Sequence, residues 1–160
     1  MNKLLLSLHV LAAIVAVGPV TVAASMFPAT LRRALDDSHD GDARTTLRTL
    51  HRICRVYAGL GVAVPVFGLA TASSLGVLGD AWLITSIALT AAAAGVLALV
   101  ILPAQERVLA ERTGEVSALP APTPTPLTPG RLAMVTGIFN LLWATVTVLM
   151  IIRPGSTTGV

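Results

Sequence analysis

The chain has 160 residues, of which 54% are hydrophobic and 12% are charged, whereas a soluble domain carries about 25% charged residues. The net charge of +3 does not indicate a nucleic-acid-binding protein, because the basic residues flank apolar segments and the aromatic content is only 4%. The single cysteine excludes an intrachain disulfide, and the sequence contains no glycine-rich phosphate loop, GxSxG turn or HExxH zinc motif.

Four charge-free apolar segments predict a single integral membrane domain over residues 1–160. They cover about residues 4–27, 56–78, 81–102 and 132–152. As helices, at about 1.5 Å per residue, each is long enough to cross a hydrocarbon core of about 30 Å. Helices are expected because lipid offers no partners for main-chain polar groups. The predicted fold class is therefore all-α, a four-transmembrane-helix bundle with both termini outside the cell.

The first span contains the most informative residue, His9. An ionisable side chain inside a span is costly and is by default a functional hypothesis. Small residues such as Ala16 and Ala23 share its helix face, whereas Leu11 and Ile14 lie on the opposite face. Since small residues favour helix–helix contacts, we expect His9 to point into the bundle.

The same segment also resembles a secretory signal peptide. Lys3 is followed by an apolar run, and residues 22–24 offer a small-residue cleavage site before Ser25. Cleavage would carry the arginine-rich segment that follows across the membrane, against the positive-inside rule. Both interpretations stay open, and the mass of the intact mature protein distinguishes them.

Residues 28–55 are predicted to form a cytoplasmic connection. Pro28 ends the apolar run of the first span, and residues 44–55 are expected to be helical and to continue into the second span. Four arginines share one face of this helix: Arg44, Arg48, Arg52 and Arg55. We expect them to anchor the protein on anionic lipid headgroups, which are the predicted partners together with a possible second copy or membrane subunit.

Counting from the ends of the spans places several polar residues at the depth of His9. We expect an intramembrane polar cluster of His9, Ser73, Thr85, Ser86, Asn140 and Thr147. In the second span, Pro65 predicts a kink, and Gly68 with Ala72 predicts a close helix contact. No catalytic or metal-binding set emerges from these residues.

A proline-rich linker is predicted at residues 119–130, and polyproline II is its natural conformation. The two long connections carry nine of the 11 basic residues, so the positive-inside rule places them in the cytoplasm. The predicted location is therefore the cell membrane, with extracytoplasmic termini.

The sequence resembles a bacterial membrane-protein family known as domain of unknown function 2269. The similarity is carried by residues 8–13, 17–19, 27–28, 31–33 and 55–57, with Pro65 and Gly68. More distantly, residues 8–12 resemble the first span of HemJ-type protoporphyrinogen oxidases and CopD-type copper-resistance proteins. The HemJ resemblance implies haem as a cofactor and His9 as its ligand, although the charged residues expected in later spans are missing.

Two functions are therefore compared. The first is a non-enzymatic multi-pass membrane protein, either an accessory subunit or a small-molecule permeation element. The alternative is a haem- or metal-binding membrane redox protein that uses His9 as a ligand. Transfer of protons through His9 is a weaker third hypothesis, because the spans contain no carboxylate to pair with it.

Overall fold

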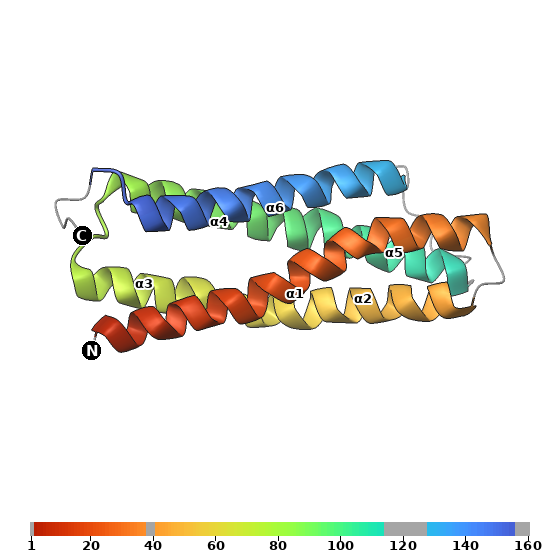
Figure 1. Ribbon diagram of the computed structural model, residues 1–160, viewed down its shortest axis with the longest axis horizontal. Helices are drawn as coiled ribbons and strands as arrows, with labels where there is room; N and C mark the ends of the chain where they lie inside the picture. Colours follow the sequence, from red (N-terminus) through yellow and green to blue (C-terminus); the bar gives the residue numbers. More distant parts are fainter. Residues whose placement is uncertain (1, 38–40, 114–127, 156–160) are drawn as a thin grey trace.

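The computed structural model describes residues 2–37, 41–113 and 128–155, and within these ranges the secondary structure is helical (Figure 1). The elements in chain order are α1 (Asn2–Asp36), α2 (Gly41–Leu60), α3 (Ala63–Leu75), α4 (Ala81–Gly95), the π-helix η1 (Val96–Ile101), α5 (Leu102–Thr113) and α6 (Pro129–Ile152). Four helical segments are long and apolar enough to cross a membrane: Lys3–Asp36, Gly41–Leu75, Ala81–Glu111 and Pro129–Ile152. The predicted all-α membrane bundle is thus confirmed, and the chain is a multi-pass membrane protein.

The helices extend well beyond the predicted spans. The connection predicted at residues 28–55 is mostly helical, because α1 continues through Pro28 to Asp36 and α2 begins at Gly41. Leu31 and Ala34 of α1 are buried in the same core cluster as Leu47 and Leu50 of α2, and this packing stabilises the extension. The linker predicted at residues 119–130 lies mostly outside the described residues.

The second crossing segment is broken between α2 and α3. Pro65 has no N–H group, so it cannot bond to the carbonyl four residues earlier, which belongs to Gly61. The helix is interrupted at Gly61–Val62, where Val64 N–H bonds to Gly61 O at 3.1 Å instead. The predicted kink is therefore present, one turn before the proline.

The third crossing segment contains the rare π-helix η1 between α4 and α5. At its end, Leu102 N–H bonds to the carbonyl of Leu97, five residues earlier. Wide turns of this kind occur mostly inside α-helices, frequently at functional sites.

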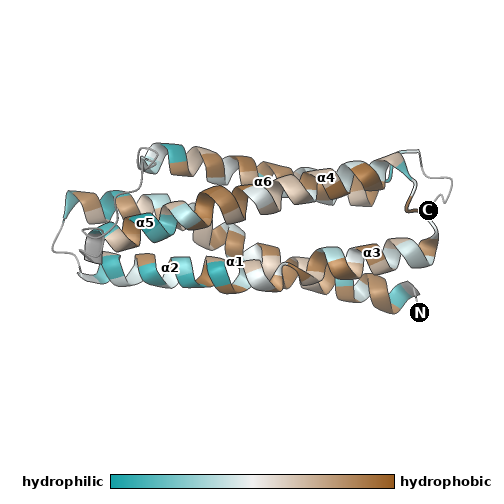
Figure 2. Cartoon of the chain, turned by 180° about the vertical axis from the view of Figure 1, so that it is seen from behind, coloured by the Kyte–Doolittle hydropathy of each residue, from teal (hydrophilic) through white to brown (hydrophobic). Residues whose placement is uncertain are grey.

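The two ends of the bundle differ. One end of the bundle is formed by α5, the last turns of α1 and the first turns of α2, and we call it the arginine end. The helices there share one core, which includes Phe27, Leu47 and Ile101. Figure 2 shows that this end carries the more hydrophilic helix surfaces. Toward the opposite end, where α1 begins and α6 ends, α3 packs on α1 and α4 packs on α6 (Figure 1). The helices there form two pairs, which meet again near the end of the bundle in a small buried cluster of Ala72, Trp82 and Leu83.

Candidate functional site

His9 joins α1 to α3 near the break in the second segment. Its Nδ1–H donates a hydrogen bond of 2.9 Å to the carbonyl of Val64, in the first turn of α3. The imidazole ring also packs on Gly68, where an added Cβ atom would lie 2.9 Å from His9 Cε1. His9 therefore points into the bundle, and Gly68 provides the space that its ring occupies.

His9 contacts α3 at an earlier residue than the one predicted by counting from the ends of the spans. The count starts the first helix at Leu4 and ends the second segment at Leu78, which matches His9 with residues 72–74. In the structure α1 begins at Asn2 and α3 ends at Leu75. The same count from these bounds arrives at Gly68, the observed contact.

The hydroxyls predicted to surround His9 bond within their own helices instead. Thr85 donates to Ala81 O, Ser86 to Trp82 O and Thr147 to Trp143 O, each at 2.8–2.9 Å. Ser86 is buried, whereas Ser73, Thr85 and Thr147 are exposed. The hydrogen bonds of the described residues thus do not join these side chains into one cluster with His9.

Asn140 forms a separate contact between α6 and α1. Its Nδ2 donates to Ser25 Oγ at 3.1 Å. Three buried polar atoms along this side of α6 have no hydrogen-bond partner within the described ranges: Thr136 Oγ1, Asn140 Oδ1 and Trp143 Nε1. The contact between α6 and α1 therefore leaves some buried hydrogen-bonding atoms without partners in the described part of the chain.

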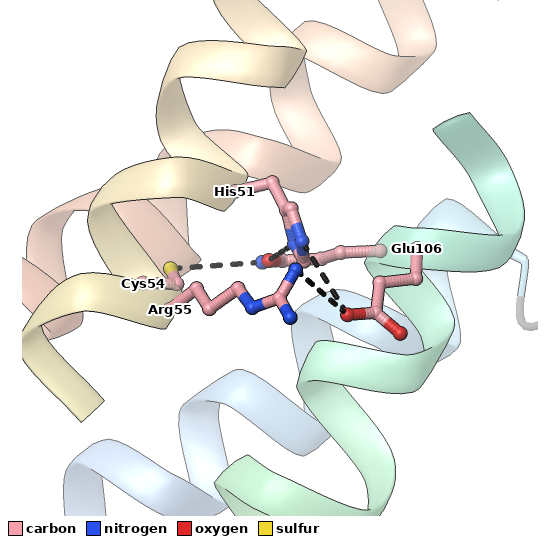
Figure 3. A network of polar contacts seen from close by, with 5 residues as sticks. His51, Cys54, Arg55 and Glu106 are labelled. Atoms are coloured by element: carbon pink, nitrogen blue, oxygen red, sulfur yellow. Dashed lines mark hydrogen bonds and ion pairs between the residues drawn. The ribbon is translucent and has the colours of Figure 1, made fainter. Parts of the chain in front are cut away.

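A polar network that the sequence analysis missed joins α2 to α5 (Figure 3). Gln105 is fully buried. Its Oε1 accepts a hydrogen bond from His51 Nδ1 at 3.1 Å, and its Nε2 donates to Cys54 Sγ at 3.8 Å. His51 Nε2 and Arg55 Nη1 both approach Glu106 Oε1, at 3.7 and 3.9 Å. When His51 is protonated, both of its N–H groups face oxygen acceptors.

The four arginines of α2 lie at different levels along the helix axis. If the apolar core covers about 20 residues counted back from Leu75, it ends near Val56. Arg52 and Arg55 then fall in the headgroup layer, which is about 5–8 Å deep on each side. Arg44 is 11 residues from Arg55, about 16 Å along the helix. All four side chains are exposed, and on this placement Arg44 and Arg48 lie beyond the headgroup layer.

A cavity of about 170 Å³ lies where the two helix pairs diverge. Its wall is almost wholly apolar and includes the aromatic rings of Tyr57, Phe139 and Trp143. The helix break contributes Gly61, Val62 and Pro65 to this wall. Val62, which is 63% exposed, and Ala94, which is also exposed, both line the cavity. The cavity therefore reaches the lipid-facing surface.

The cavity does not offer a haem site with His9 as the ligand. The ring of His9 is held between Val64 and Gly68, and His9 is not among the residues that line the cavity. A cavity of about 150 Å³ holds one benzene ring, whereas haem contains four pyrrole rings. The described residues also contain no group of three side chains suited to a metal ion.

Comparisons with family models, curated proteins and solved structures find no match for this chain. Its function is therefore inferred from the cavity and from the side chains around it.

Proposed function

We propose that this chain is a non-enzymatic multi-pass membrane protein that binds a lipophilic small molecule in the cavity between its helix pairs. The observation that carries this proposal is an apolar cavity that reaches the lipid-facing surface. Because the cavity is open to the surface, an apolar molecule from the bilayer can enter it and gain van der Waals contacts with its wall.

The chemistry of the cavity wall supports binding rather than catalysis. Its polar side chains are Tyr57, Thr90 and Trp143, and Thr90 already donates to Ser86 O at 2.7 Å. Among the described lining residues there is no carboxylate, imidazole, thiol or amine to act as acid, base or nucleophile. Of the two non-enzymatic roles considered, the cavity favours the one that handles a small molecule.

The arginine end is proposed to face the cytoplasm of a cell membrane, with both termini outside. Arg32, Arg33 and the four arginines of α2 belong to this end, whereas the opposite end carries Lys3 and Arg153. The positive-inside rule supports this orientation. Reporter fusions at residues 40 and 120 are expected to be active only with cytoplasmic reporters, and activity of an exterior reporter would contradict the orientation.

The binding proposal is tested through Trp143 as a fluorescent reporter. The chain has two tryptophans, so Trp82→Phe leaves only Trp143 in the cavity wall. Titration of this variant in micelles with 1-bromooctane, an apolar quencher, should reduce its emission with a saturating dependence. The mirror variant, Trp143→Phe, should show only the linear quenching that partition into the micelle produces.

A matched pair of alanine substitutions provides the control. Ala94→Phe places a ring in the cavity, whereas Ala92 is an exposed residue of the same helix that does not line it. We expect saturable quenching to be lost in Ala94→Phe and retained in Ala92→Phe, with circular dichroism confirming that both variants fold. Identical linear quenching in both variants would show that the cavity does not bind.

A further inference from the structure

The geometry points to an anionic phospholipid as the occupant, with one acyl chain in the cavity and its phosphate on Arg52 and Arg55. This inference rests on the proposed function and adds the chemical class of the ligand. Its basis is the juxtaposition of the cavity with the two arginines that lie at headgroup depth.

The cavity wall and Arg55 share one face of the second crossing segment. Ala58 lies three residues after Arg55, so the two share one face of α2, and Val62 follows in the helix break. Ala58 and Val62 both line the cavity. Arg55 is about 10 Å from Val62 along the axis, and one leaflet of the hydrocarbon core is about 15 Å deep. An acyl chain that starts at the phosphate therefore reaches the cavity.

The charge at this position suits a phosphate. The side chain of Arg55 is 73% exposed, and its ion pair with Glu106 is long, at 3.9 Å. Glu106 also approaches the imidazole of His51, so its carboxylate is shared between two partners. The guanidinium of Arg55 retains N–H groups for a phosphate, and Arg52 adds a second exposed cation one turn away. Glu106 is the opposing charge, and it weakens this site.

The test compares two phospholipids that carry brominated acyl chains, phosphatidylglycerol and phosphatidylcholine, in bilayers that contain the Trp82→Phe variant. We expect brominated phosphatidylglycerol to quench Trp143 at lower mole fraction, with a preference of about fivefold for each arginine. Arg55→Gln should remove about fivefold of that preference, and Arg55→Lys should restore most of it. Glu106→Gln should increase the preference.

Arg44→Gln and Arg48→Gln are the matched controls, because each removes one exposed charge from the same helix beyond the headgroup layer. These variants should keep the preference for phosphatidylglycerol within twofold of the parent. A loss of about fivefold is expected only where the removed arginine contacts headgroups. An equal loss in Arg44→Gln and Arg55→Gln would overturn the headgroup site. Equal saturable quenching by both lipids would overturn the anionic ligand while leaving the cavity proposal intact. No saturable quenching by either lipid, or by 1-bromooctane, would overturn both.

Discussion

Gly68→Ala tests whether the His9 contact stabilises the bundle. The new Cβ would lie 2.9 Å from His9 Cε1 and 3.1 Å from Nδ1, so the ring must move. Because Nδ1 bonds to Val64 O, such movement also weakens a hydrogen bond worth about 0.6 kcal/mol in a membrane. Overpacking costs about 1–3 kcal/mol, and replacing a helical glycine with alanine returns about 0.5–1 kcal/mol. We expect a net destabilisation of about 1–2 kcal/mol.

The assay is unfolding in mixed micelles by titration with sodium dodecyl sulfate, followed by circular dichroism. Gly137→Ala is the matched control, because a Cβ at this helical position meets no described atom within 4 Å. This control should be neutral or stabilising. In the background of His9→Ala, Gly68→Ala should lose its penalty, since the ring that it clashes with is gone. If Gly68→Ala is as stable as the parent while His9 is present, the steric argument is wrong.

Two further predictions concern other buried polar groups. Thr136→Val should stabilise the protein by about 1 kcal/mol in the same unfolding assay, because the Thr136 hydroxyl is buried and lacks a partner in the described part of the chain. Thr71→Val removes an equally buried hydroxyl that bonds to Phe67 O and should destabilise by about 0.5 kcal/mol; the reverse order would contradict this accounting. Cys54 is fully buried beneath Gln105, so maleimide labelling should be slow in the parent and much faster in Gln105→Ala. Glu106→Ala, which alters a neighbour that does not contact Cys54, should label as slowly as the parent.

The composition was sufficient to predict the class of fold. Long runs without charge admit few structures other than crossing helices, and Pro65 marked the kink because a missing N–H group acts locally. The buried face of α1 was also predictable, because small and large apolar residues occupy opposite faces of this helix. Ala16 and Ala23 are buried, whereas Leu11 and Ile14 are exposed.

The polar contacts were less predictable, because they depend on relative depth. An error of two or three residues at a helix end moved the partner of His9 from Ser73 to Val64 and Gly68. The sequence also contains no mark for a main-chain acceptor such as Val64 O. The useful signal that was missed is the spacing of His51 and Cys54, which places both residues on one helix face. Their partner is the amide of Gln105, which the structure shows to be buried.

The π-helix η1 determines which residues of α5 face α2. If residues 96–101 formed a regular α-helix, everything from Leu102 onward would be turned by about 100° and shifted by about 1.5 Å. Gln105 would then face away from His51 and Cys54, although its place in the sequence would be unchanged. The wide turn thus lets the face of α5 that packs on α2 be set independently of the face of α4 that packs on α6. Each half of this crossing can match a different neighbour, in a way that no single helical wheel over the segment describes.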